Sequence, residues 1–395
     1  MKILHLVYSG QRRGAETFAL QLSRSLSLAQ GPVTQAFSSV YGFSDELLEG
    51  ELPLYPLRAE RRGLGHWLHV DPRAVFRLAR LTRQFQPDFV LAHGADTLKY
   101  TALARPFFPA KTRVVYRNIG FASYWVSSPL KARLSGLLLR NVDAVISVGQ
   151  ASARDFGETY GFPSSRTVAI PNGVDARPFL ESDRAATRLK TRRDLGLDPA
   201  ESVAMFVGSL SDEKNPRLPV EVIARLKGQG KNWRLLFVGE GPQRAELEEQ
   251  AGVLGVSNLV RFLGSRADVP ALLPAADLLL LPSRTEGMPA VVIEAGLAEV
   301  PALAYAVGDV GEVVQHGVTG ILVPPGNALG FQQAALDAAQ DPAKLRQLGL
   351  AARQRYARAY DMTIIARQYY ETLLQLQDNP ERLSLTHGNA SDGGR

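Results

Sequence analysis

Residues 278–295 read Leu-Leu-Leu-Leu-Pro-Ser-Arg-Thr-Glu-Gly-Met-Pro-Ala-Val-Val-Ile-Glu-Ala, and this stretch decides the fold. The four leucines form a short apolar run of the kind that makes a buried strand. A polar turn follows, and Pro289 then marks the start of a second apolar segment, which we interpret as a helix. Strand, turn and helix in this order build parallel α/β sheets, whose ligands bind beyond the carboxyl ends of the strands.

The same alternation of short apolar runs and longer helical segments occurs twice along the chain, which predicts two parallel sheets. In the first half the expected strands are residues 3–7, 88–92, 113–116, 144–148 and 167–170. In the second half they are residues 204–207, 234–238, 259–262, 278–281, 302–305 and 320–323. Between the two sets lies Pro171-Asn172-Gly173-Val174-Asp175, whose proline and Asn-Gly pair are typical of a turn.

This turn predicts an N-terminal Rossmann-like domain over residues 1–172 and a C-terminal one over residues 173–358. A helical stretch within residues 359–378 is expected to pack back across both domains, and the polar, glycine-rich residues 379–395 are expected to be a disordered tail. The first apolar run is interpreted as a strand and not as a secretory signal. No run of ~20 apolar residues predicts a membrane span.

The amino-acid composition excludes some kinds of site and indicates which partners to expect. The chain contains no cysteine, which excludes disulfides, thiolate zinc sites and cysteine nucleophiles. Residues 1–170 hold 21 Lys and Arg against 12 Asp and Glu, whereas the remainder holds 24 against 27. The basic half suits an anionic partner, such as a lipid headgroup or a phosphorylated acceptor, or it carries scattered solubilising arginines. Aromatic platforms do not alternate with basic residues, so no nucleic acid partner is expected.

Polar residues in two strand-to-helix loops point to a bound anion. Glu286 lies in the turn and Glu294 more than one turn into the helix, so the two carboxylates can face different parts of one ligand. Amides near Pro289 are free to face a diphosphate, and Lys214 in another loop can neutralise one. The competing interpretation makes Glu286 a helix cap, Glu294 a solvated residue and Lys214 an exposed loop lysine.

The segment from Ser283 to Ala295 resembles the two-glutamate motif of glycosyltransferase family 4. Segments 171–175, 208–214, 239–242 and 262–266 are also similar to that family and follow in the expected order. The resemblance implies an α/β GT-B fold, in which two Rossmann-like domains face each other across a cleft. It further implies transfer of a sugar, with retention of its anomeric configuration, from a nucleoside diphosphate sugar to an acceptor hydroxyl.

The resemblance also suggests roles for individual residues. Lys214 and the amides of residues 287–289 would hold the diphosphate, Glu294 the ribose, Glu286 the transferred sugar and Arg266 the base. The donor-binding candidates are Gly14, Ser209, Lys214, Gly239, Arg266, Glu286, Gly287, Met288, Pro289 and Glu294. The catalytic candidates are Glu286, Lys214, His93 and Asn118. The acceptor-binding candidates are Arg13, His93, Arg117, Tyr124 and Trp125.

Three positions depart from the family pattern. Arg13 replaces the first of two successive glycines, Ser209 replaces a frequent arginine, and Ile119 occupies the place of a sugar-orienting histidine. Arg117 or Asn118 is expected to substitute for that histidine. His93 is interpreted as an orienting residue or a structural histidine, and Arg266 as a base-stacking or a surface arginine. Tyr124 and Trp125 are interpreted as an acceptor platform, a membrane-surface anchor or buried aromatics.

The sequence also leads to expectations about the metal, the donor and the acceptor. No Asp-x-Asp triplet occurs, so we expect metal-independent chemistry without a cofactor. Family frequency favours a UDP-sugar donor, with a GDP-sugar second. The acceptor is expected to be a sugar, a lipid-linked saccharide or a small molecule, and the place of action the cytoplasm with peripheral contact at the inner face of the membrane. The alternatives are a sugar-nucleotide epimerase or hydrolase of the same fold and a non-catalytic nucleotide-sugar-binding protein.

Overall fold

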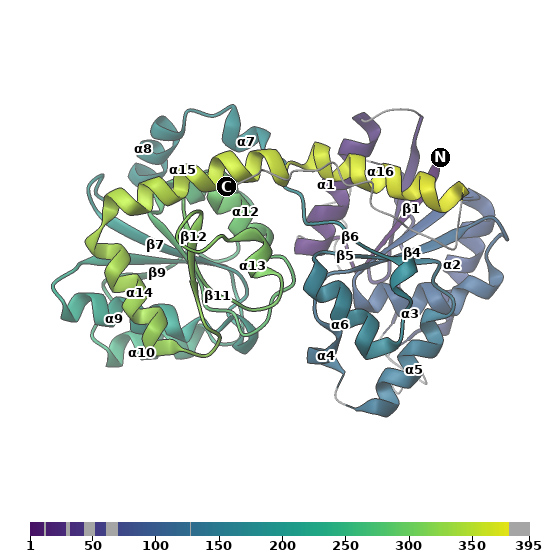
Figure 1. Cartoon of the computed structure of the whole chain (residues 1–395), viewed down its shortest axis with the longest axis horizontal. Coiled ribbons are helices and arrows are strands. Elements are labelled where there is room, and N and C mark those ends of the chain that lie inside the picture. Colours follow the sequence, from purple (N-terminus) through teal and green to yellow (C-terminus); the bar gives the residue numbers. More distant parts are fainter. Residues whose placement is uncertain (12, 29–31, 43–51, 61–69, 127, 379–395) are drawn as a thin grey trace, which may run out of the picture. The chain divides into compact units, whose positions relative to one another are not determined.

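Each half of the chain folds around its own parallel sheet with helices on both faces (Figure 1). The computed structural model describes residues 1–11, 13–28, 32–42, 52–60, 70–126 and 128–378. Unit 1 comprises Met1–Pro171 and Ile365–Arg395, and unit 2 comprises Asn172–Ile364. The tail expected at residues 379–395 lies outside the described residues.

The sheet of unit 1 has the strand order β2-β1-β3-β4-β5-β6, with every pair parallel. Its strands are β1 (Lys2–Val7), β2 (Thr34–Ser39), β3 (Phe89–His93), β4 (Arg113–Asn118), β5 (Ala144–Ser147) and β6 (Thr167–Ala169). Strand β2 was not expected from the sequence, because Gln35, Ser38 and Ser39 give it a polar appearance. All three are buried, and Gln35 donates from Nε2 to the Ser23 carbonyl at 2.9 Å, so its polarity is satisfied inside the fold.

Seven α-helices and two short 3₁₀ turns of the described part surround this sheet. They are α1 (Gly14–Leu28), α2 (Pro72–Phe85), α3 (Ala95–Ala104), η2 (Arg105–Phe107), α4 (Ala122–Trp125), α5 (Pro129–Leu139), α6 (Gln150–Tyr160), η3 (Ser164–Arg166) and, from Ile365 on, α16 (Met362–Asp378). Leu4 and Leu6 of β1 belong to a large apolar cluster, whereas Val7 belongs to a smaller one with α1. The strand therefore buries both of its faces, as parallel sheets do.

The sheet of unit 2 has the order β12-β11-β10-β7-β8-β9, again all parallel. Its strands are β7 (Ser202–Val207), β8 (Trp233–Val238), β9 (Val260–Phe262), β10 (Leu278–Leu281), β11 (Ala302–Tyr305) and β12 (Gly320–Val323). The chain proceeds outward from β7 in one direction and from β10 in the other, so these neighbours flank the topological switch point. Every strand expected from the sequence is present to within two residues at each end.

The helices of unit 2 cover both faces of this sheet (Figure 1). They are α7 (Arg177–Leu180), α8 (Arg184–Asp194), η4 (Asp212–Lys214), α9 (Arg217–Gly228), α10 (Arg244–Val253), α11 (Val269–Leu272), η5 (Leu273–Ala275), α12 (Ala290–Leu297), α13 (Val310–Val313), α14 (Ala328–Gln340) and α15 (Pro342–Ala359). None of the helices among the described residues has the length and apolar character to cross a membrane.

Candidate active site

The switch point of unit 2 brings together two side chains that lie 72 residues apart in the sequence. Lys214 ends η4, in the loop after β7, and Glu286 lies in the turn after β10. The Lys214 Nζ donates to Glu286 Oε1 at 2.8 Å, and Glu213 Oε1 lies 3.6 Å from the same nitrogen. Glu286 is 9% exposed and Lys214 24%, so the pair is partly shielded from water but reachable from one side.

Backbone contacts fix these two loops against each other. The Arg284 amide donates to the Glu213 carbonyl at 2.8 Å, and Asn215 Nδ2 donates to the Pro282 carbonyl at 3.3 Å. Asn215 has a φ of 50°, a left-handed conformation that asparagine tolerates better than most residues. The ammonium and the carboxylate are therefore held in place by the loops that carry them.

The charge of Lys214 is stabilised by its neighbours. Burial alone would lower the pKa of its ammonium group, but the Glu286 and Glu213 carboxylates outweigh that effect and raise the pKa above its ordinary value. The group is therefore a cation throughout the physiological pH range. An incoming diphosphate would compete with Glu286 for this ammonium group and could take over its charge-assisted hydrogen bond.

Glycines let the loops after β7 and β8 pack backbone to backbone. A Cβ atom at Gly239 would lie 2.0 Å from the Gly208 carbonyl oxygen, and one at Gly241 would lie 2.4 Å from the Leu210 oxygen. The Gly208 amide donates to the Val238 carbonyl at 2.9 Å, and the Gly239 amide to the Gly264 carbonyl at 2.8 Å. These contacts explain why glycine stands at position 239, whatever its part in donor binding.

The amino terminus of α12 faces the same edge of the sheet. Pro289 is its N-cap, and no side chain caps the helix, so amides of its first turn are available to an anion. Met288 is 4% exposed; its Sδ accepts from the Asn172 amide at 3.3 Å and its carbonyl from Asn172 Nδ2. With its side chain engaged, Met288 can offer a ligand only its backbone, as can Gly287.

Glu294 and Ser283 are polar groups that the fold leaves unsatisfied. Glu294 is half-buried on α12, and the described residues provide its carboxyl group with no hydrogen bond or ion pair. The fully buried Ser283 hydroxyl, two residues after β10, likewise has no partner in the described part of the chain. Since buried polar groups are normally paired, both are candidates for contact with a ligand. Ser283 was not among the residues expected to bind the donor, although its place directly beyond a buried strand was the available signal.

We expect the stability of the fold to depend on pH through Glu294, because desolvation raises the pKa of its carboxyl group from 4.5 to about 7. Between these two values the folded chain holds a proton that the unfolded chain has released, so stability falls as pH rises through this window. We expect Glu294→Gln, which cannot ionise, to stabilise the unliganded protein at pH ~8 by about 1–3 kcal/mol and to change little at pH ~5.

Urea unfolding at the two pH values measures this effect. Glu249→Gln is the matched control, because Glu249 is exposed on α10. A Glu294→Gln variant whose stability runs parallel to that of the wild type between the two pH values would contradict the elevated pKa.

The remaining donor candidates of unit 2 lie on exposed loops. Ser209 is exposed and forms no hydrogen bond among the described residues. Arg266 forms a two-pronged ion pair with Asp268, with Nε to Oδ1 at 2.7 Å and Nη2 to Oδ2 at 2.6 Å. The pair holds the guanidinium in one plane, which leaves its faces open for stacking on a base. The role of Arg266 stays a prediction.

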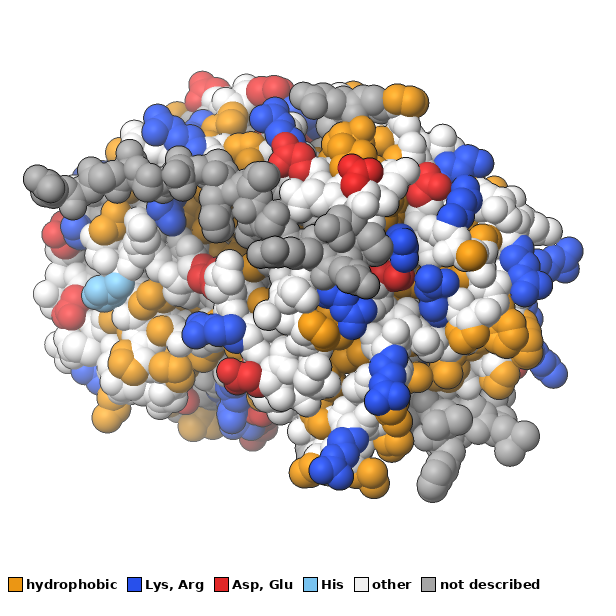
Figure 2. All heavy atoms as spheres, turned by 45° about the vertical axis from the view of Figure 1, so that its right-hand side comes forward, with side chains coloured by type: hydrophobic (Ala, Val, Ile, Leu, Met, Phe, Trp, Pro, Cys, Tyr) orange, Lys and Arg blue, Asp and Glu red, His pale blue; other side chains and the backbone are white. Residues whose placement is uncertain are grey.

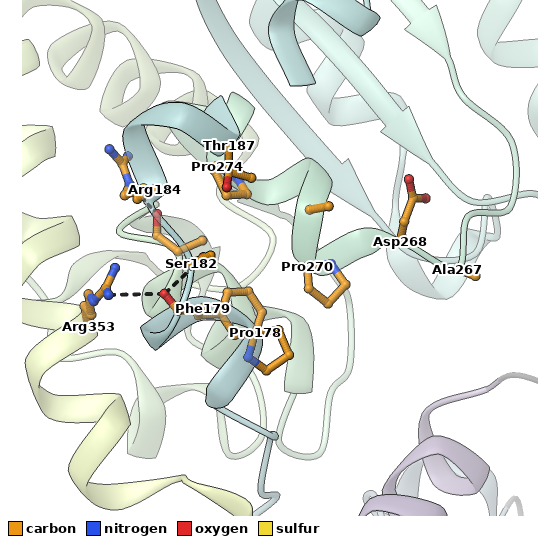
Figure 3. Close-up of a pocket in the computed structure, with 12 residues that line it drawn as sticks. Pro178, Phe179, Ser182, Arg184, Thr187, Ala267, Asp268, Pro270, Pro274 and Arg353 are labelled. Carbon is orange, nitrogen blue, oxygen red and sulfur yellow. Dashed lines mark hydrogen bonds between the residues drawn. The ribbon is translucent and has the colours of Figure 1, made fainter. Parts of the chain in front are cut away.

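A pocket of about 330 Å³ in unit 2 lies close to the Arg266 loop, and Asp268 contributes to its wall (Figure 3). Pro178, Phe179 and Pro270 give it an apolar lining. Its arginines are engaged: Arg353 Nη2 donates to the Phe179 carbonyl at 3.2 Å, and Arg184 Nε to the Ala298 carbonyl at 2.8 Å. Neither Lys214 nor Glu286 lines this pocket, so the candidate site stays at the strand ends.

In unit 1 the central strands β1 and β3 carry a buried histidine pair. His5 Nδ1 and His93 Nε2 lie 3.2 Å apart, and His5 Nε2 lies 2.9 Å from Gln35 Oε1. Burial lowers the pKa of His5 to about 4 and that of His93 well below its ordinary value, so both are neutral at pH 7. His93 is 1% exposed, and its Nδ1 has no partner among the described residues. That nitrogen is the atom through which His93 could orient a ligand.

Arg117 lies in the interior of unit 1 and does not reach the surface. Its guanidinium lies 3.6 Å from the centre of the Phe18 ring, and Tyr369 of α16 interacts with it electrostatically. Glu16 is buried in the same region, and burial raises the pKa of its carboxyl group. Arg117 is thus in position to support the α1 and α16 packing, and its direct contact with an acceptor stays untested.

The other candidates of unit 1 divide into buried and exposed groups. Asn118 is 5% exposed and donates to the Ser147 hydroxyl at 2.9 Å and to the Ser152 carbonyl at 3.3 Å. Arg13 is exposed, with Nη2 3.1 Å from Gln11 Oε1, and a Cβ atom at Gly14 would meet nothing within 4 Å. The space that a side chain at position 14 would enter is therefore open.

Tyr124 and Trp125 are exposed and not buried in the core. Tyr124 is 48% and Trp125 67% exposed, and their rings contact each other edge to face with centroids 5.1 Å apart. The interpretation as buried aromatics is therefore wrong, because α4 is a single turn that directs both rings outward. Both rings are accessible to an acceptor or to a membrane surface.

Comparisons with known proteins agree with this geometry. Residues 187–355 match the family model described as glycosyl transferases group 1, and residues 12–177 match that of glycosyltransferase family 4. Glycogen synthase of Mycobacterium tuberculosis (strain CDC 1551 / Oshkosh) is 31% identical over 310 residues, which cover 75% of this chain and 72% of that protein. The chain belongs to glycosyltransferase family 4. It is a GT-B glycosyltransferase, as the sequence motifs indicated.

Two further relatives place this transferase within the family. The 2-deoxystreptamine glucosyltransferase of Streptomyces kanamyceticus is 27% identical over 308 residues, covering 74% of this chain and 78% of that protein. The crystal structure of Anabaena HepE in complex with UDP-glucose has a TM-score of 0.80 and 26% identity, and covers 95% of this chain and 100% of that one. The two six-stranded α/β units therefore form the fold that the resemblance implied.

Proposed function

We propose that this transferase moves a sugar from a UDP-sugar to an acceptor hydroxyl with retention of configuration and without a metal ion. The Lys214–Glu286 pair at the switch point of unit 2 carries this proposal, because it joins a cation suited to a diphosphate to a carboxylate suited to a sugar. The UDP-glucose complex of Anabaena HepE supports UDP as the nucleotide.

The donor would lie along the carboxyl edge of β7 and β10. Lys214 and the first amides of α12 would bind the diphosphate, and the unpaired carboxylate of Glu294 would accept hydrogen bonds from the ribose. Transfer of the Lys214 hydrogen bond to the diphosphate would release Glu286 to accept a hydrogen bond from a hydroxyl of the transferred sugar. Ser283 would gain the partner that it lacks in the described chain.

The reaction breaks the bond between the anomeric carbon and the diphosphate oxygen and forms a bond from that carbon to the acceptor oxygen. Retention follows if the acceptor attacks from the face that the diphosphate leaves, and its proton then passes to the departing phosphate oxygen. Negative charge grows on the diphosphate as the bond breaks. A fixed ammonium group lowers the energy of that charge more than it lowers the energy of the bound donor.

Protein groups would supply the charge that a metal ion supplies in other sugar transferases. Lys214 contributes a full positive charge, and the uncapped α12 contributes the positive end of its dipole. Within the described ranges, no group of three or more His, Asp or Glu side chains is arranged as a metal site. The positive charges of Lys214 and of the α12 amino terminus support a donor site that works without a divalent ion.

Unit 1 would bind the acceptor through its exposed candidates Arg13, Tyr124 and Trp125, with the Nδ1 of His93 as an orienting group. The excess of basic residues in the first half of the chain supports a lipid-linked or cell-envelope saccharide. Such an acceptor would place the transferase at the cytoplasmic face of a membrane, with peripheral contact.

The anomer released by slow hydrolysis of UDP-glucose tests the stereochemistry without knowledge of the acceptor. Water replaces the acceptor hydroxyl in this side reaction, and proton NMR distinguishes α-glucose from β-glucose before they interconvert. We expect α-glucose first, at a rate that EDTA does not change. Early β-glucose would contradict retention, and loss of turnover with EDTA that Mg²⁺ restores would contradict metal independence.

A further inference from the structure

Helix α5 of unit 1 has an apolar face that nothing in the described chain covers. Leu130 is 66% exposed, Leu134 56% and Leu137 50%, although leucine side chains are usually buried. Their spacing of four and three residues places them on one side of the helix. Tyr124 and Trp125, on α4 just before α5 in the sequence, are exposed as well. We call Tyr124, Trp125 and the three leucines the α5 face.

Basic residues border this face. The sequence of α5 contains Lys131 and Arg133 and no acidic residue, and Arg140 follows directly. All three are exposed, and the side chains of Arg133 and Arg140 form no hydrogen bond or ion pair within the described chain. Figure 2 shows hydrophobic and basic side chains side by side along the lower part of unit 1, with few acidic ones.

Nearby acidic residues neutralise little of this charge. Asp143 is engaged with Arg105 at 3.6 Å and with Arg113 at 3.5 Å. Asp155 of α6 accepts from the Ser123 amide at 3.1 Å. Glu158, exposed on α6, is the other acidic residue between α4 and η3.

Three arginines line a cavity next to the leucines. It measures about 490 Å³ and is lined by Arg133 and Arg140 of the α5 segment, by Arg166 of η3 and by the rings of Tyr160 and Phe162. Arg166 lies over the Phe162 ring at 4.8 Å, which fixes its direction. Guanidinium groups bind phosphate oxygens through paired hydrogen bonds, so this cavity suits a phosphate headgroup.

We propose that the α5 face docks unit 1 onto an anionic lipid bilayer. The leucines and Trp125 enter the boundary between headgroups and acyl chains, and Arg133, Arg140 and Arg166 bind lipid phosphates in the cavity. A second copy of the chain is a poorer occupant, because its own α5 face would bring like charges together.

The docked surface includes two of the acceptor candidates of unit 1, Tyr124 and Trp125. Strand β4 ends at Asn118, and α4, which carries Tyr124 and Trp125, follows at the same edge of the sheet. A saccharide attached to a lipid would therefore emerge near these residues. The inference rests on the peripheral membrane contact proposed above. The test of this inference measures binding to vesicles and not turnover. A negative result would therefore leave the proposed glycosyl transfer reaction unaffected.

Flotation with lipid vesicles tests the apolar part of the surface. The full-length protein is mixed with phosphatidylcholine vesicles that contain about 30% phosphatidylglycerol, and with pure phosphatidylcholine vesicles. We expect binding to the anionic vesicles, and Leu130→Ser/Leu134→Ser/Leu137→Ser should weaken it at least ~10-fold. The control Leu329→Ser/Leu350→Ser alters leucines that are 70% and 50% exposed in unit 2 and should bind as the wild type does.

Charge reversal tests the arginines. Arg133→Glu/Arg140→Glu should reduce binding at least ~10-fold, because each basic group near an anionic surface contributes about 1 kcal/mol. The control Arg193→Glu/Arg346→Glu makes the same change in net charge at exposed positions of unit 2. Salt at ~1 M should weaken binding of the wild type, since it shortens the screening length to about 3 Å. Unchanged thermal unfolding of each variant confirms that the fold is intact.

Three results would overturn the proposal. The first is that the wild type does not float with anionic vesicles. The second is that the triple leucine variant, or the double arginine variant, binds them as strongly as its control. The third is a dimer in solution that the leucine changes dissociate while vesicle binding persists, which would assign the α5 face to a second copy of the chain.

Discussion

Replacing Lys214 with alanine is expected to lower kcat/KM for a UDP-sugar by roughly 10²–10³-fold, about 3–4 kcal/mol of transition-state stabilisation. The ammonium group is fixed by Glu286 at 2.8 Å and by two loops whose backbones are bonded to each other. Its charge opposes the charge that develops on the diphosphate, and no other Lys or Arg side chain within the described chain forms an ion pair with Glu286. Steady-state kinetics with the natural or a surrogate acceptor, or donor hydrolysis, measures the loss.

Two control variants separate charge from structure. Lys190→Ala removes an exposed lysine of unit 2 that pairs with Asp194 at 3.1 Å, and it should leave kcat/KM unchanged. Lys214→Arg keeps the charge and should retain more activity than Lys214→Ala, although its planar group fits a single-point contact less well. Near-normal turnover by Lys214→Ala would remove this residue from the mechanism.

Replacing Gly239 with alanine is expected to destabilise unit 2 by about 3 kcal/mol or more and to abolish nucleotide binding. Its φ of 138° lies in a region that L-residues rarely adopt, and the new Cβ atom would lie 2.0 Å from the Gly208 oxygen. That oxygen belongs to backbone and cannot rotate away. The loops after β7 and β8 would have to separate, and the Lys214 loop follows directly on Gly208.

Gly228→Ala is the matched control for this change. Gly228 ends α9, and a Cβ atom there would meet nothing within 4 Å. Alanine favours a helix over glycine by about 1 kcal/mol, so this variant should be as stable as the wild type or slightly more so. Urea unfolding compares the two. A Gly239→Ala protein with an unchanged unfolding midpoint would show that the loops are not held as described.

The strands of unit 2 were predictable because burial on both faces leaves a simple pattern. Leu278–Leu281 are at most 3% exposed, and a continuous apolar run of this kind has few interpretations once a polar turn and a proline follow. The pairing of Lys214 with Glu286, in contrast, could not be predicted from the sequence. Each residue was a candidate from its own loop, but their contact depends on β7 and β10 being neighbours, which strand order alone decides.

Unit 1 was harder to predict, because it buries polar residues. Gln35 of β2 resembles a surface residue until its partners, Ser23 and His5, are placed beside it by the fold. Arg117 was expected to substitute for the family histidine whose place Ile119 occupies, whereas the residue is 3% exposed and its guanidinium packs on Phe18. Long-range contacts between α1, β4 and α16 create that environment, and no local sequence pattern predicts them.

The exposed leucines of α5 show the opposite limitation. An apolar residue in a helical segment is normally taken for core, and sequence spacing cannot reveal that Leu134 is 56% exposed. The structure was needed to separate apolar residues that hold unit 1 together from those that remain available to a partner.

Calorimetric titration of UDP into the protein, with EDTA present, tests the central claim most directly. The claim is that unit 2 holds a UDP-sugar at the Lys214–Glu286 pair without a metal ion. We expect binding of one UDP per chain to the wild type, and affinity for UDP reduced at least ~10-fold by Lys214→Ala, since a charge-assisted hydrogen bond to the diphosphate contributes about 1.5–3 kcal/mol. Absence of binding, or equal affinity of the wild type and Lys214→Ala, would contradict the account.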